Sequence, residues 1–110
     1  MNQLGMLIDV SEMAKEAGIK FPVLVTGALW ENVLPNVFEK QLGQTIADRL
    51  SDVLGMFRTA TGSGGVLSYE LYVLRSQGVY CSKETIRVKA ICFPGEKGEP
   101  IIVIMLYNET

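Results

Sequence analysis

The stretch that decides the fold is IIVIMLY, residues 101–107, which is apolar at almost every position. In a β-strand, successive side chains point to opposite faces of the sheet. One face therefore carries Ile101, Val103 and Met105, and the other carries Ile102, Ile104 and Leu106. A strand with helices on only one side alternates between apolar and polar residues. This run thus predicts that both faces are shielded, either by the N-terminal segments of the same chain or by another chain.

The segment PGEKGEP, residues 94–100, stands directly before this strand. A phosphate-binding loop leads from a strand into a helix and offers its backbone amides to the ligand. This segment leads from strand to strand, and Glu96 and Glu99 would repel a phosphate. We therefore predict a hairpin turn, with glycines at the permissive backbone angles and with its charges, including Lys97, in water.

Upstream, the pattern changes from β-like to helical. Residues 67–73 and 85–92 alternate between apolar and polar, which predicts two further strands of an antiparallel meander. Residues 37–59 predict one long amphipathic helix that packs on the sheet, because apolar residues recur at steps of three and four. That apolar stripe consists of Phe38, Leu42, Ile46, Leu50, Val53 and Phe57. Charged residues such as Glu39 and Asp48 fall off the stripe.

Shorter elements are expected in the first third of the chain. Asp9 and Glu12 have the spacing of a capping box for a short helix, which Gly18 would end. FPVLVT, residues 21–26, reads as a buried strand, and Thr26 is placed to cap a second short helix. Asn36 can cap the helix that follows. The predicted class is therefore α+β: one long helix and one or two short helices on an antiparallel sheet that ends in a C-terminal β-hairpin.

The composition limits the class of protein. A chain of 110 residues fits a single domain, residues 1–110, and its 48% hydrophobic content suffices for a core without a metal or a disulfide. Cys81 and Cys92 fall in β-like stretches, and we expect reduced thiols in the core. The sequence has no histidine, which excludes Ser-His and Cys-His nucleophilic pairs and the usual zinc sites. We predict no enzyme activity, no cofactor and no bound metal.

Nothing in the sequence indicates export or membrane insertion. Residues 1–18 lack a basic region followed by a long apolar segment, and no run reaches the roughly 18 apolar residues that span a bilayer. We expect a cytoplasmic protein. The net charge is −2 with both signs mixed along the chain, which disfavours nucleic-acid binding. The alternative that stays open is a small nucleic-acid-binding protein with a weakly basic sheet face, formed by Arg75, Lys83, Arg87 and Lys89.

A candidate interaction surface follows from the excess of apolar residues on the sheet. Ile91 and Phe93 precede the charged turn and share a face with Arg87 and Lys89. Trp30 is expected to pack in the core beneath its helix, with a binding hot spot as the alternative. The predicted surface consists of Trp30, Arg87, Lys89, Ile91, Phe93, Glu96, Lys97, Glu99, Ile102 and Ile104. A protein partner or a second copy of the chain, forming a homodimer, would bind there.

Three segments in this order carry a resemblance: VTGALW (25–30), DRLSDVL (48–54) and PGEKGEPIIVIM (94–105). They resemble the Val-Thr-x-Ala-x-Trp, Arg-Leu-x-Asp-x-Leu and Pro-Gly-acid…Glu-Pro…Ile-Met segments of a family of small uncharacterised proteins encoded on bacterial plasmids and phages. Phe93 stands where that family has glycine, and YNET replaces its usual acidic tail. The resemblance implies a mobile-element origin and supplies no catalytic residue.

These observations lead to one functional expectation. We predict a non-enzymatic accessory protein of a mobile element that acts through protein–protein interaction. Small phage and plasmid proteins often inhibit host defence, including restriction and CRISPR systems, and by analogy we expect an activity of that kind.

Overall fold

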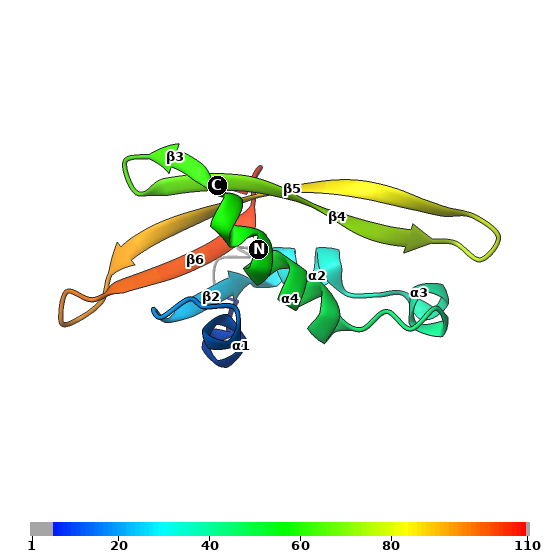
Figure 1. Cartoon of the computed structure of the whole chain (residues 1–110), viewed down its shortest axis with the longest axis horizontal. Helices are drawn as coiled ribbons and strands as arrows, with labels where there is room; N and C mark the ends of the chain where they lie inside the picture. Colours follow the sequence, from blue (N-terminus) through cyan, green and yellow to red (C-terminus); the bar gives the residue numbers. More distant parts are fainter. Residues whose placement is uncertain (1–5, 110) are drawn as a thin grey trace.

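The computed structural model describes residues 6–109, and its class is α+β (Figure 1). Over these residues, six strands form one sheet in the order β1-β2-β6-β5-β4-β3. The strands are β1 (Leu7–Asp9), β2 (Val23–Thr26), β3 (Thr61–Ser63), β4 (Val66–Ser76), β5 (Cys81–Pro94) and β6 (Pro100–Leu106). The helices are α1 (Ser11–Glu16), α2 (Gly27–Val33), α3 (Val37–Gln41), α4 (Ile46–Gly55) and the 3-10 helix η2 (Met56–Thr59).

The sheet is mixed rather than antiparallel throughout. Its β4, β5 and β6 strands are consecutive antiparallel neighbours, and residues 95–99 join β5 to β6. On the other side of β6, β2 runs parallel to it, with Val25 opposite Ile104. The strand β6 therefore lies in the interior of the sheet, where neighbours on both sides satisfy its backbone.

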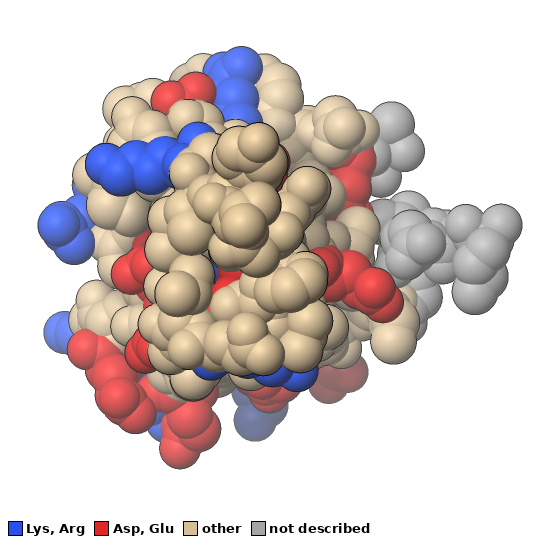
Figure 2. Space-filling model, turned by 90° about the vertical axis from the view of Figure 1, so that its right-hand side faces the viewer, with Lys and Arg blue, Asp and Glu red and all other residues tan. Residues whose placement is uncertain are grey.

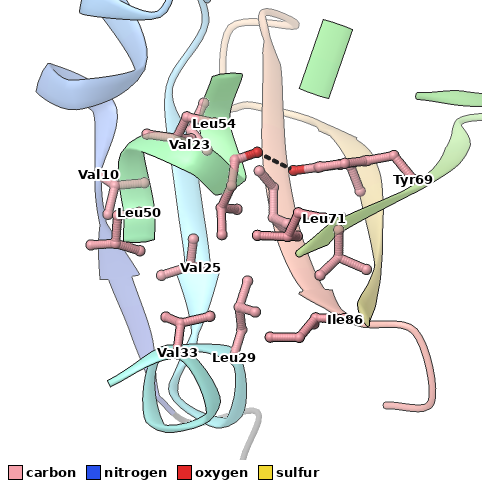
Figure 3. Close-up of a cluster of buried hydrophobic side chains, with 14 of the residues drawn as sticks. Val10, Val23, Val25, Leu29, Val33, Leu50, Leu54, Tyr69, Leu71 and Ile86 are labelled. Atoms are coloured by element: carbon pink, nitrogen blue, oxygen red, sulfur yellow. Dashed lines mark hydrogen bonds between the residues drawn. The ribbon is translucent and has the colours of Figure 1, made fainter. Parts of the chain in front are cut away.

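Helices α1, α2 and α4 cover one face of the sheet, and the main core lies between them (Figure 3). Val25, Leu71 and Ile104 contribute to this core from the strands, whereas Leu29 and Leu54 contribute from the helices. The Tyr69 hydroxyl donates a hydrogen bond of 2.7 Å to the carbonyl oxygen of Val53, so the one phenol in this core has a partner. We call the face of the sheet that packs against these helices the helix-covered face, and the opposite face the outer face.

The outer face of β6 is also shielded. Val103 and Met105 point to this side and are buried. Glu109 turns back over the sheet: its carboxylate accepts hydrogen bonds from the Thr26 hydroxyl at 2.7 Å and from the Leu106 amide at 2.8 Å. Lys89 donates from its ammonium group to the Glu109 carbonyl.

The single long helix predicted over residues 37–59 is wrong. The chain breaks between α3 and α4, where Gly43 has φ of +87° and ends the first helix. The Thr45 hydroxyl then accepts the Asp48 amide hydrogen and begins α4, which has 10 residues. As a result, Phe38 and Leu42 are exposed although the stripe placed them in the core.

The break allows a buried ion pair to form. Arg49 and Glu39 are ten positions apart, so in a continuous helix of 1.5 Å rise they would be separated by about 15 Å along the axis. In the folded chain, Arg49 Nη2 lies 3.0 Å from Glu39 Oε1, and both side chains are almost fully buried. The break between α3 and α4 brings these two side chains together.

Local capping predictions have mixed outcomes. The Thr26 side chain accepts the Leu29 amide, and Asn36 caps α3 in a capping box with Glu39. The capping box predicted at Asp9 is wrong, because the residue before α1 is Val10 and Asp9 accepts the amide of Ser11 instead.

The β4–β5 hairpin extends past the rest of the sheet and elongates the molecule, which measures 50 × 33 × 23 Å. Its β5 strand pairs with β6 only from Val88 onward, so residues 70–87 have no third strand beside them. We call residues 70–87 the arm. It points to the right in Figure 1, with α3 lying below its end.

Candidate functional site

The structure separates the residues of the predicted interaction surface. Ile102 and Ile104 lie on the helix-covered face with at most 4% of their surface exposed, so the expectation that they contact a partner is wrong for these two. Trp30 is half-buried on α2 and packs against the core, as the core interpretation predicted. The charged residues Glu96, Lys97 and Glu99 are exposed in the segment that joins β5 to β6.

Four predicted residues lie together on the outer face of β5, but the two charged ones already have partners. The Arg87 guanidinium lies 3.9 Å from the centre of the Tyr107 ring, and Lys89 is bound to Glu109. Ile91 is half-buried, so Phe93, which is 45% exposed, offers the largest apolar area of the four. The predicted residues therefore do not form one continuous surface.

The basic residues of the nucleic-acid alternative are similarly dispersed. Arg75 pairs with Glu84 at 3.1 Å and donates to Asn32, and Lys83 lies 5.7 Å from the Tyr72 ring centre. No contact of residues 6–109 specifically favours a phosphate backbone, and nucleic-acid binding stays an untested alternative.

The prediction that both cysteines lie in the core is wrong. Cys81 and Cys92 are free thiols, and both are exposed. Cys81 begins β5 at the arm, whereas Cys92 lies near the opposite end of the same strand.

Exposed apolar side chains, which the sequence did not predict, lie on two neighbouring segments at the end of the arm. The turn between β4 and β5 contributes Val79 and Tyr80, which are 88% and 77% exposed. The neighbouring helix α3 contributes Val37 and Phe38, and its C-terminal cap contributes Leu42; all three are exposed. We call these five residues the arm tip. Figure 2, which views the molecule from this end, shows a largely uncharged centre with charged side chains around its rim.

Hydrogen bonds join helix α3 to the end of the arm. Glu39 Oε2 accepts the Ser76 amide hydrogen at 2.9 Å, and the Asn36 side-chain amide donates to the Ser76 carbonyl at 2.9 Å. The Phe38 ring lies directly beside Gly78, in contact distance of the position where a Cβ would stand. The arm tip therefore has a defined shape although its side chains face water.

Arg49 anchors this assembly to the rest of the fold. Besides its ion pair with Glu39, its guanidinium donates to the carbonyl oxygens of Val33 and Leu74. These contacts join α2, α3, α4 and β4 at one buried point. The Arg49 Nε atom has no hydrogen-bond partner among the described residues.

The electrostatics of Glu39 favour a structural role. Burial alone would raise its pKa, but the amide hydrogens of Ser76 and Asn36 and the charge of Arg49 more than offset this effect. The pKa of Glu39 therefore lies below its ordinary value of 4.5, and the side chain stays ionised at neutral pH. A permanently ionised and fully bonded carboxylate does not exchange protons with a substrate near neutral pH.

Other titratable groups with shifted pKa values do not gather at one site. Burial and the nearby charge of Asp48 raise the pKa of Asp52, and burial raises the pKa of Tyr69. Within residues 6–109, no group of three or more cysteine or acidic side chains is arranged to hold a metal ion. Over the same residues, no helix is both long and apolar enough to cross a membrane.

No protein-family model, curated protein or solved structure matches this chain. The resemblance to plasmid and phage proteins, and the mobile-element origin that it implies, therefore stay predictions.

Proposed function

We propose that the protein is a non-enzymatic binding protein that acts through protein–protein contact at the arm tip. The observation that carries this proposal is the exposure of five apolar side chains at one end of the molecule. Val79 and Tyr80 lie in the turn of the projecting β4–β5 hairpin, and Val37, Phe38 and Leu42 lie on or next to α3. Exposed apolar clusters rimmed by polar groups are typical of interaction sites, and aromatic residues often dominate their binding energy.

The rigidity of the arm tip supports the same proposal. Binding is tighter when the contacting groups are already ordered, because less conformational entropy is lost. The buried contacts of Glu39 with Ser76 and Arg49 order α3 against the arm before any partner arrives. A buried ion pair that contributes little net stability is well suited to specify a geometry of this kind.

A site-specific photo-crosslinking experiment tests the proposal. A benzophenone amino acid at Val79 should give a discrete adduct with one partner protein in a bacterial host, identified by mass spectrometry. The same group at Lys97, in the exposed β5–β6 connection, is the control and should not give that adduct. Leu42→Asp, a change at an exposed residue, should remove the adduct while the chain stays folded.

Self-association is a distinct outcome of the same design. If the adduct contains a second copy of this chain, sedimentation should show a dimer that Leu42→Asp dissociates. Identical adducts from Val79 and Lys97, or a monomer without any adduct, would contradict a binding role for the arm tip.

We further propose, from the resemblance and by analogy, that the partner belongs to a host-defence system of the restriction or CRISPR type. Cells that carry such a system and express the protein should then lose protection against phage infection. Expression of Leu42→Asp at the same level should leave protection intact. Full protection in the presence of the unaltered protein would contradict this assignment but not the binding role itself.

A further inference from the structure

A pocket of about 660 Å³ lies between the α1–β2 connection, the C-terminal end of α4 with η2, and strands β5 and β6. We propose that it binds a small amphipathic anion, with an apolar body in the pocket and a carboxylate at its mouth. The pocket is near the end of β5 opposite to the arm, so this proposal goes beyond the protein-binding function and does not rest on it.

The residues that line the pocket indicate that the ligand has an apolar body. Ile19 and Phe21 line it from the segment before β2, Phe57 lines it from η2, and the buried Leu54 and Ile102 belong to the same lining. Small-molecule sites usually have volumes of roughly 300–1,000 Å³ and mostly apolar walls with few polar groups. An aliphatic or aromatic body matches these walls.

The charged residues of the pocket indicate that the head group of the ligand is an anion. Lys20 and Arg58 are its charged lining residues, and no acidic residue of the described chain lines it. Arg58 Nη1 donates to the Gly55 carbonyl at 2.9 Å, which leaves further guanidinium N–H groups to bind an anion. Neither Lys20 nor Arg58 belongs to an ion pair among residues 6–109. Two cations without a local acid are complementary to a carboxylate.

Gly55 is an independent observation that points to an occupant. It lines the pocket at the end of α4 and has helical angles, φ −65° and ψ −37°, that every residue type adopts. No atom lies within 4 Å of the position where its Cβ would stand. Glycine weakens a helix relative to alanine, so neither conformation nor packing accounts for it here. The absence of a side chain at Gly55 leaves open space at the wall of the pocket.

The reactivity of the two cysteine thiols can report whether a ligand occupies the pocket. Cys92 lines the pocket, whereas Cys81 lies at the start of the same strand and is exposed on the arm. Eleven positions separate them, which is roughly 35 Å at about 3.3 Å per residue of strand. A ligand in the pocket therefore shields Cys92 and leaves Cys81 unchanged.

The experiment measures alkylation of both thiols by iodoacetamide, resolved by mass spectrometry, in the presence of decanoate. We expect decanoate to slow modification of Cys92 but not of Cys81. Decanol and decyltrimethylammonium have the same chain with a neutral and a cationic head, and both should protect less well. In a series of shorter carboxylates, affinity should fall roughly fourfold for each methylene removed. Equal protection by decanol and decanoate would overturn the assignment of an anion site.

Matched variants separate occupancy from folding. Gly55→Leu should fill the pocket and abolish decanoate binding in calorimetry, without lowering the unfolding temperature. Ser51→Leu places the same side chain at an exposed position of the same helix outside the pocket, and it should bind decanoate normally. Undiminished binding by Gly55→Leu would overturn the proposal.

A second variant tests the head group. Lys20→Gln combined with Arg58→Gln should reduce decanoate affinity to that of decanol and leave decanol affinity unchanged. Leu42→Asp at the arm tip should not affect either ligand, so a failure of this proposal is distinguishable from a failure of the protein-binding role. Unchanged decanoate affinity in the double variant would contradict the role of the two cations.

Discussion

Glu39 and Arg49 illustrate how much of this fold depends on two side chains. Their carboxylate and guanidinium are 3.0 Å apart, and nearly all of both side chains is buried. Removing one partner of such a pair leaves an uncompensated charge in a low-dielectric environment, which is far more costly than the pair's net contribution to stability. The same separation of 3.0 Å joins Lys15 to Glu12 at the surface, where both side chains are mostly exposed.

These two ion pairs give a matched prediction. Glu39→Gln should lower the free energy of unfolding by about 3–5 kcal/mol. Glu12→Gln should change it by less than about 1 kcal/mol, since water screens exposed pairs. Urea denaturation measures both values. The double variant Glu39→Gln/Arg49→Met should lose less than the sum of its single changes, and strict additivity would contradict the coupling.

The lowered pKa of Glu39 also predicts a pH dependence. Because the folded state lowers this pKa, Glu39 contributes stability above its unfolded value of 4.5, and this contribution is lost as pH falls through the lower folded value. The unfolding free energies of the wild type and Glu39→Gln should therefore differ by a constant amount at neutral pH and should converge in acid. Urea denaturation series at several pH values measure this difference, and a difference that grows on acidification would contradict the sign.

At the residue scale, the sequence predicts what neighbouring positions determine. The caps at Thr26 and Asn36 are identifiable because each side chain bonds to an amide three residues ahead. The Glu39–Arg49 pair is not identifiable, since its formation depends on the break between α3 and α4. Glu39 falls off the apolar stripe and therefore resembles an exposed helical residue, although it is 1% exposed.

At the scale of elements, the break between α3 and α4 has the largest effect on the surface. The apolar stripe of residues 37–59 has the correct period for one helix, but Gly43, Gln44 and Thr45 interrupt it. Periodicity predicts which residues share a helical face but not whether that face stays continuous. Because the core accommodates only the second half of the stripe, Phe38 and Leu42 become part of the arm tip.

Two glycines of this region give opposite predictions. Gly43 has φ of +87°, which disfavours an L side chain, so Gly43→Ala should lower the free energy of unfolding by about 1 kcal/mol. Gly55 has helical angles and open space around its Cβ position, so Gly55→Ala should raise it by about 0.5–1 kcal/mol. Denaturation of both variants under identical conditions checks this. A stabilising Gly43→Ala would indicate that a continuous helix is accessible after all.

At the scale of the whole molecule, the two faces of strand β6 are buried to different extents. Ile104 lies fully buried on the helix-covered face, whereas Ile101 is partly exposed on the outer face. Ile104→Ala should cost about 2–5 kcal/mol, since it leaves a cavity in the main core. Ile101→Ala should cost clearly less, because solvent can fill the space. Equal losses in urea denaturation would contradict the assignment of the two faces.

The general architecture follows from the sequence, but the sheet order does not. Alternating runs at residues 67–73 and 85–92 and the two-sided apolar run at residues 101–107 predict an α+β fold with both faces of the last run shielded. The parallel pairing of β2 with β6 cannot be predicted from the residues of either strand, because a strand's side chains do not specify which distant strand it pairs with. The exposed Val79–Tyr80 pair in a turn is the one sequence feature that could have indicated the arm tip.

The position of β6 between β2 and β5 has a consequence for biosynthesis. Residues 27–99 separate β2 from its parallel partner β6 in the sequence. During translation, β2 therefore has no partner on its β6 side until these residues have been synthesised. Folding into the final sheet is therefore a late event that depends on contacts between distant segments, and such folding is intrinsically slow. During this interval the apolar face of β2 is open to chaperones and to aggregation.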